Sequence, residues 1–93
     1  MEAKLPKVYV EVNADFMPNG DMIPRTVRWE DGTLYRIDRV IEYATDCEMR
    51  SGGRADRYTV KIGTRETYLF FERSKPFSRY TIGKWVMERR YRS

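Results

Sequence analysis

The fold is decided by residues 57–72, which read RYTVKIGTRETYLFFE. Apolar and polar residues alternate on both sides of Gly63-Thr64, and a period of two is the pattern of half-buried β-strands. A turn at Gly63-Thr64 would give four cross-strand pairs: Lys61–Glu66, Thr59–Tyr68, Val60–Thr67 and Tyr58–Leu69. Opposite charges and β-branched–aromatic pairs stabilise neighbouring strands. The stretch therefore predicts an antiparallel hairpin of strands 57–62 and 65–72.

The same alternation recurs along the chain between turn dipeptides such as Asn19-Gly20 and Asp31-Gly32, which favour chain reversal. In the first such run, Val8, Val10 and Val12 fall on one face. The further strands expected are residues 7–16, 22–29, 34–43 and 80–87. The alternation breaks at residues 39–41, which predicts a bulge or a bend. Residues 44–56 are polar and rich in glycine, and we expect them to form the longest loop.

The hairpin around Asp31-Gly32 has two plausible registers. A three-residue connection over 31–33 would pair Trp29 with Tyr35 and Val27 with Ile37. A two-residue turn would pair Trp29 with Leu34 and Val27 with Arg36. The first register places large apolar groups together, and burial of one face fixes the register of a strand, so the first is favoured.

Five or six short strands in 93 residues predict an all-β protein with one small domain over residues 1–93. We expect a five- to six-stranded antiparallel, partly open barrel of the SH3-like type, with an OB-like barrel as the alternative. Residues 1–6 and 89–93 are expected to be frayed tails. A chain of this length has one small core and little room for a deep cleft.

The composition argues against an enzyme. The chain has no histidine and one cysteine, which removes the usual general base and the Ser-His and Cys-His nucleophile arrangements. Cys47 lies between Asp46 and Glu48, and neighbouring carboxylates disfavour the thiolate. No spacing singles out a metal, cofactor or carboxylate-pair site. We therefore expect no catalytic residue, no metal and no cofactor.

The expected location is the cytoplasm. A lone cysteine cannot form an internal disulfide, which favours a reducing compartment. No apolar run approaches the length of a membrane span, and the N-terminal residues 1–6 lack the apolar core of a signal peptide. No membrane association is expected.

The positive charge is concentrated in the second half of the chain. Residues 1–46 carry six Lys/Arg and nine Asp/Glu, a balance of −3, whereas residues 47–93 carry twelve and five, a balance of +7. Basic and aromatic side chains together bind phosphates and stack on bases. One hypothesis is therefore a nucleic-acid-binding barrel, with these candidate residues: Arg54, Arg57, Lys61, Arg65, Tyr68, Arg89 and Arg90.

The favoured hypothesis is a non-catalytic protein-interaction module or accessory protein. Small barrels expose edge strands that accept a strand from a partner or from a second copy of the same chain. Tyr, Trp, Arg and Met are enriched at the centre of interfaces. The apolar residues expected to contribute, if exposed, are Tyr9, Phe16, Met17, Met22 and Met49.

The motifs DMIP (21–24), WEDG (29–32), YRIDRV (35–40), RYTVKI (57–62), TYLFFE (67–72) and WVME (85–88) span most of the chain. In these motifs the chain resembles a group of short, uncharacterised bacterial all-β proteins. The resemblance covers residues 7–88 and implies a compact all-β unit. It carries no catalytic, cofactor-binding or partner-binding residue to this chain.

Overall fold

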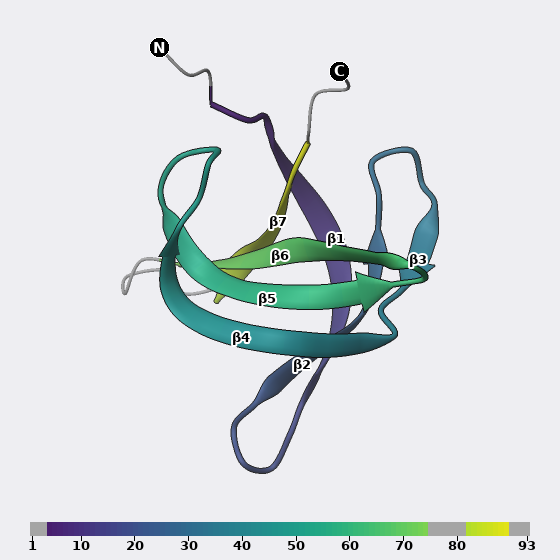
Figure 1. The fold of residues 1–93 in the computed structure, drawn as a ribbon. Helices are drawn as coiled ribbons and strands as arrows, with labels where there is room; N and C mark the ends of the chain where they lie inside the picture. The colour runs from purple at the N-terminus through teal and green to yellow at the C-terminus, as the bar shows by residue number, and fades with distance from the viewer. Residues whose placement is uncertain (1–3, 75–81, 90–93) are drawn as a thin grey trace.

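The computed structural model describes residues 4–74 and 82–89, and the strands in them form one antiparallel sheet. The strands are β1 Lys7–Phe16, β2 Met22–Arg28, β3 Leu34–Arg36, β4 Arg39–Glu48, β5 Arg54–Ile62, β6 Arg65–Arg73 and β7 Gly83–Glu88. Their order is β3-β2-β1-β7-β6-β5-β4, and the sheet curls into an open half-barrel (Figure 1). The described residues contain no helix. The predicted all-β class is confirmed, with seven strands rather than five or six.

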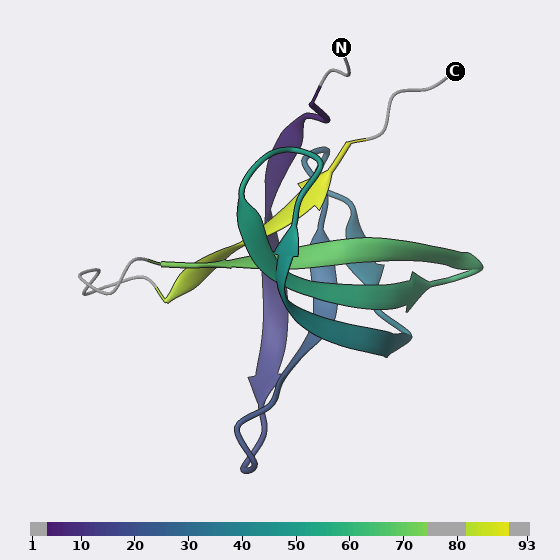
Figure 2. The same ribbon diagram turned by 60° about the vertical axis from the view of Figure 1, so that its left-hand side comes forward.

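β1 bends the sheet because its two halves pair with different neighbours. Residues 7–10 pair with β7, whereas residues 11–16 pair with β2. Figures 1 and 2 both show β1 running steeply across the direction of β4, β5 and β6. The β1–β2 hairpin therefore extends past the sheet that β4–β7 form, and the sheet stays open between this hairpin and the edge strand β4.

Three hairpins use the same three-residue turn. In the β1–β2 turn, the N–H of Met17 donates to the carbonyl of Asp21 at 2.7 Å, and the N–H of Gly20 donates to the carbonyl of Met17 at 2.9 Å. The β2–β3 and β4–β5 turns repeat both hydrogen bonds. Gly20 has a φ of +95°, a conformation that glycine adopts without the steric cost of a Cβ atom. The shape of these turns is thus set locally.

The inner face of the half-barrel holds the main core. Val60 and Leu69 are buried at its centre, and Ile37, Tyr58 and Phe71 pack around them. A second cluster lies on the opposite face of the sheet: Met49, Ala55, Phe70 and Val86. β6 is buried on both faces over residues 69–71, so it is the strand around which both clusters form.

The β5–β6 hairpin has the register that its sequence predicts. Lys61 pairs with Glu66, Thr59 with Tyr68, Val60 with Thr67 and Tyr58 with Leu69. The bulge expected at residues 39–41 is also confirmed, because the pairing of β4 with β5 shifts between Val40 and Glu42. The local sequence pattern is sufficient to predict the β5–β6 register, because both strands and their turn are continuous in the sequence.

Both predicted registers of the β2–β3 hairpin are wrong. The structure pairs Val27 with Tyr35, and Arg28 with Leu34. The turn comprises residues 30–32, one residue earlier than expected, because the N–H of Trp29 donates to the carbonyl of Thr33 at 2.8 Å. Gly32 has a positive φ at the end of the turn, a conformation that glycine adopts without steric cost. The need for glycine at this position, and not the pairing of apolar side chains, decides the register.

The strand predicted over residues 34–43 is in fact two strands, β3 and β4. The chain changes partner between them: the N–H of Ile37 donates to the carbonyl of Arg25 in β2, and that of Asp38 donates to the carbonyl of Lys61 in β5, both at 2.8 Å. Residues 37 and 38 thus connect β3 and β4, the two edge strands of the sheet. It explains the seventh strand, which alternation alone does not reveal.

The long loop predicted over residues 44–56 is also wrong. β4 continues to Glu48 and β5 begins at Arg54, which leaves five residues between the strands, with the three-residue turn at 50–52. A second bulge between Ala44 and Cys47, with Asp46 at a φ of +52°, accommodates the broken alternation. Arg54 and Asp46 of this segment are exposed and form an ion pair, whereas Asp56 is buried.

The ends of the described chain are tied to the sheet. Leu5 donates a backbone hydrogen bond to the carbonyl of Arg50, and Arg89 donates one to that of Pro6, although these residues fall in or next to the predicted frayed tails. The last strand begins at Gly83 rather than at residue 80. Residues 1–3, 80–81 and 90–93, on which parts of these predictions fall, lie outside the described residues.

Candidate binding groove

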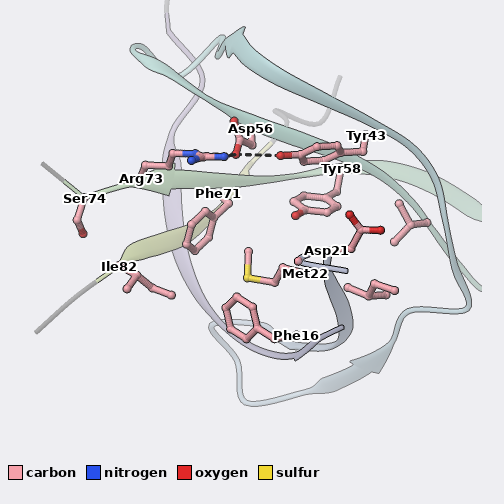
Figure 3. Close-up of a pocket in the computed structure, with 13 residues that line it drawn as sticks. Phe16, Asp21, Met22, Tyr43, Asp56, Tyr58, Phe71, Arg73, Ser74 and Ile82 are labelled. Atoms are coloured by element: carbon pink, nitrogen blue, oxygen red, sulfur yellow. Dashed lines mark hydrogen bonds and ion pairs between the residues drawn. The ribbon is translucent and has the colours of Figure 1, made fainter. Parts of the chain in front are cut away.

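A groove of about 660 Å³ occupies the open side of the half-barrel. One wall is the β1–β2 hairpin, with Phe16 and Met22, and the other is the sheet of β4, β5 and β6, with Tyr43, Tyr58 and Phe71 (Figure 3). The volume lies within the range of ligand-binding sites, roughly 300–1,000 Å³. The groove follows directly from the change of partner along β1, which separates the hairpin from the sheet.

The hairpin wall is held in shape by its turn. The Oδ1 of Asn19 accepts a hydrogen bond from the N–H of Asp21 at 3.0 Å, and its Nδ2 donates to Oδ2 of Asp21 at 3.0 Å. Phe16, at the end of β1, leaves 66% of its surface exposed. Ile82, at 68% exposed, lines the same groove, and exposed apolar side chains gathered in one place are typical of an interaction site.

The sheet wall is built from stacked aromatic rings. Tyr43 and Tyr58 lie 4.8 Å apart between ring centroids, and Trp85 packs behind them, 5.5 Å from Tyr58 and 4.9 Å from Phe71. Tilted pairs at these distances are favourable for aromatic quadrupoles. The rings support one another, so this wall is preformed.

A buried carboxylate fixes the polar rim of the groove. The side chain of Asp56 is 8% exposed. Its Oδ2 accepts hydrogen bonds from the Tyr43 hydroxyl at 3.2 Å and from Nε of Arg73 at 3.0 Å, and its Oδ1 accepts one from the N–H of Asp46 at 3.4 Å. Buried charges persist in proteins when they are paired and hydrogen-bonded in this way. Figure 3 shows that these bonds orient Tyr43 along the groove.

Tyr58 contributes a hydroxyl group to the sheet wall of the groove. Figure 3 shows its hydroxyl turned toward the open space beside Phe71 and Met22, and no hydrogen bond joins it to another described residue. Burial, together with the charges of Tyr43 and Asp56, raises its pKa to about 12. The hydroxyl is therefore neutral near pH 7 and can donate a hydrogen bond to a ligand.

This pKa predicts a stability change at alkaline pH. An unfolded tyrosine has a pKa of about 10, so the stabilisation by neutral Tyr58 is complete below pH 10 and is lost as the pH rises from about 10 to 12. The loss amounts to about 2–3 kcal/mol. Urea unfolding at a series of pH values should show a steeper decline above pH 10 for the wild type than for Tyr58→Phe. Parallel curves for the two proteins would contradict this assignment.

Three of the basic residues predicted to bind nucleic acid are paired with acids, and the structure brings Arg57 and Tyr68 together. Arg54 forms an ion pair with Asp46, Arg57 with Glu42 and Arg89 with Glu30. Lys61 lies opposite Glu66, and Arg65 is exposed at the start of β6. The guanidinium of Arg57 also lies 4.7 Å from the ring centroid of Tyr68. Arg90 lies outside the described residues. None of these residues lines the groove.

Of the apolar residues predicted to contribute to an interface, Phe16 and Met22 line the groove. Tyr9 and Met17 are exposed, but they lie outside its lining. Met49 is 3% exposed and belongs to the outer core cluster, so that prediction is wrong for Met49. Met49 falls in the loop that the sequence predicts over residues 44–56. The β4–β5 turn instead packs Met49 against Phe70 and Val86.

The groove residues that sequence reasoning does not identify include Asp21, Tyr43, Asp56, Tyr58, Phe71 and Arg73. Asp56 falls in the loop predicted over residues 44–56, and the alternation predicts Tyr58 only as a strand residue. One signal was present in the sequence: an acid within the apolar alternation of β5, two residues before Tyr58. An acid on the inner face of a strand needs a cationic or hydrogen-bonding partner.

The described residues offer no metal site, since no group of three or more Cys, Asp and Glu side chains in residues 4–74 and 82–89 is arranged to hold an ion. Cys47 is a free cysteine. In the same residues, no helix has the length and apolar character that a membrane crossing needs.

Comparison with protein families, curated proteins and solved structures finds no match. The resemblance to short bacterial all-β proteins stays a prediction. The case for function therefore depends on the geometry of the groove and on the strands that border it.

Proposed function

We propose that this protein is a non-catalytic interaction module that binds an extended segment of another protein in the groove. The observation that carries the proposal is an open groove with a preformed aromatic wall, bordered by the edge strand β4. The SH3-like assignment, which also stays a proposal, fits such a role because small barrels present grooves between hairpins and edge strands.

The backbone of the edge strand β4 can form hydrogen bonds with the partner segment. Among the strands of residues 4–74 and 82–89, β4 pairs only with β5, so its other side has N–H and C=O groups that can pair with an added strand. Bulges at both ends leave Glu42–Ala44 as the regular part of this edge. Bulges limit edge-to-edge pairing, and we therefore assign a short stretch of backbone pairing to the partner segment.

Burial of apolar side chains contributes the larger part of the binding free energy. Phe16 and Ile82 lie at the rim of the groove and are 66% and 68% exposed. Covering a side chain of this size contributes about 1.5–3 kcal/mol. An apolar residue of the partner, placed between Phe16 and Phe71, would bury both walls at once, and the Tyr58 hydroxyl could donate to a carbonyl of the segment.

The test is a selection of random twelve-residue peptides displayed on phage, followed by NMR titration of the ¹⁵N-labelled protein with the selected peptides. We expect shifts concentrated in β4 and the β1–β2 hairpin. Phe16→Ser should weaken the selected peptides at least tenfold, because about 1.4 kcal/mol of lost burial corresponds to tenfold in affinity. Phe16 is exposed, so the variant should keep its fold.

The matched control is Tyr9→Ser. Tyr9 is also an exposed aromatic residue of β1, at 55%, but it lies outside the groove, on the opposite face of the strand from Phe16. Its replacement should change affinity less than twofold. Equal weakening by both substitutions, or shifts confined to another surface, would refute the groove as the binding site.

A further inference from the structure

We infer that the groove selects a partner segment with a cationic side chain, lysine or arginine, held between the aromatic wall and the carboxylate of Asp21. The inference rests on the proposed function, and it adds the chemistry of the ligand. It follows from the charges that line the groove and from the aromatic rings beside them.

The charged side chains of the lining are Asp21, Asp56 and Arg73. Arg73 is committed to Asp56, to which its Nε lies at 3.0 Å and its Nη2 at 2.9 Å, so these two charges offset one another. Asp21 forms no ion pair within residues 4–74 and 82–89, and its Oδ2 accepts only from the Asn19 amide. The lining thus carries one uncompensated negative charge, although the whole chain is positive.

The position of Asp21 suits a ligand in the groove. Figure 3 shows its carboxylate beside the ring of Tyr58, across the groove from Phe71. The charge of Asp21 is also one of the causes that raise the pKa of Tyr58, which agrees with this proximity. A cation that enters here meets a carboxylate and aromatic rings together.

Aromatic faces are negative and attract cations, most strongly where water is excluded. This chain already uses the interaction on its other face, where Lys84 lies 5.3 Å from the ring centroid of Tyr9 and Arg57 lies 4.7 Å from that of Tyr68. Among the described residues, no cation lies over the rings of the groove. Its aromatic wall and Asp21 are thus complementary to a cation from a partner.

The test compares two small probes of equal length, n-butylammonium and 1-butanol, by NMR titration of the ¹⁵N-labelled protein. We expect n-butylammonium to shift the resonances of Asp21, Met22 and Tyr58, and to bind about three- to tenfold more tightly than butanol, the factor that a cation–π contact and a screened carboxylate supply. Asp21→Asn should remove most of this preference.

Asp31→Asn is the matched control, because Asp31 occupies the middle of the equivalent β2–β3 turn, where it is exposed and accepts a hydrogen bond from the N–H of Thr33 at 2.9 Å. Asparagine keeps that acceptor, and the preference for the amine should persist. Equal affinity of the two probes, absence of groove shifts with n-butylammonium, or a preference that survives in Asp21→Asn would each overturn the inference. The peptide selection tests the two proposals separately. Peptides that bind the groove without a basic residue would support the interaction module and contradict the cation site.

Discussion

Replacing Gly83 by alanine should lower the free energy of unfolding by about 3 kcal/mol, the upper end of the usual cost of overpacking. A Cβ at this position would lie 2.6 Å from Cε2 of Phe71 and 2.6 Å from the carbonyl oxygen of Glu72. Phe71 is buried against Trp85, and the Glu72 oxygen belongs to the backbone of β6. The Glu72 oxygen is held by the backbone, so the clash is relieved only if the Phe71 ring shifts toward the groove that it borders. Urea unfolding, followed by tryptophan fluorescence, measures the change.

Gly63→Ala is the control for backbone cost alone. Gly63 has a φ of +62° and no other atom within 4 Å of a built Cβ, so alanine there should cost about 1 kcal/mol through its left-handed conformation. The loss at Gly83 should be at least twice as large. A smaller loss would mean that the Phe71 ring moves aside, and the groove wall that it forms would then be adaptable rather than preformed.

The parts of the fold that could be predicted are those whose partners are close in the sequence. The β5–β6 hairpin was predicted with its full register because the alternation and the charge pair Lys61–Glu66 agree with a turn at Gly63-Thr64. The register of the β2–β3 hairpin differs from both predicted registers by one or two residues, because the left-handed position of Gly32 outweighs apolar pairing. Turn geometry is the stronger constraint in a short hairpin.

The groove could not be predicted because it depends on contacts between distant segments. Tyr43 and Tyr58 face Phe16 only because β1 leaves β7 and pairs with β2 halfway along its length. Two bulges in β4 then decide which of its residues point inward. Bulges shift the side-chain alternation by one residue, and no pattern in a single strand reveals where the alternation resumes.

The charge asymmetry between the two halves of the chain is partly offset in the folded sheet. β4 belongs to the acidic half and β5 to the basic half, and the two strands are neighbours. Arg57 therefore meets Glu42, and Arg89, just after β7, meets Glu30 in the β2–β3 turn. Phosphate binding depends on cations gathered on one surface, so an excess of charge along the sequence gives weaker support to nucleic-acid binding than it first indicates.

Arg73→Met should cost about 3 kcal/mol, although Arg73 itself is largely exposed. The reason is its partner: removal of the guanidinium leaves the Asp56 carboxylate buried with only the Tyr43 hydroxyl and the Asp46 N–H, at 3.2 and 3.4 Å. Removing one partner of a buried ion pair is costly, because the charge of the other partner is then uncompensated. The exposed pair Arg25–Asp15 has a similar separation of 2.8 Å, and Arg25→Met should cost about 0.5 kcal/mol.

A double-mutant cycle separates this coupling from lost packing. Removing both charges in Asp56→Asn/Arg73→Met should cost less than the sum of the single substitutions, by at least about 1 kcal/mol, because the double variant leaves no buried charge without its partner. Urea unfolding at pH 7 measures all four proteins. Additive losses would show that Arg73 acts through packing alone. Because the Tyr43 hydroxyl bonds the same carboxylate oxygen, the coupling also tests whether the rim of the groove is held by one shared network.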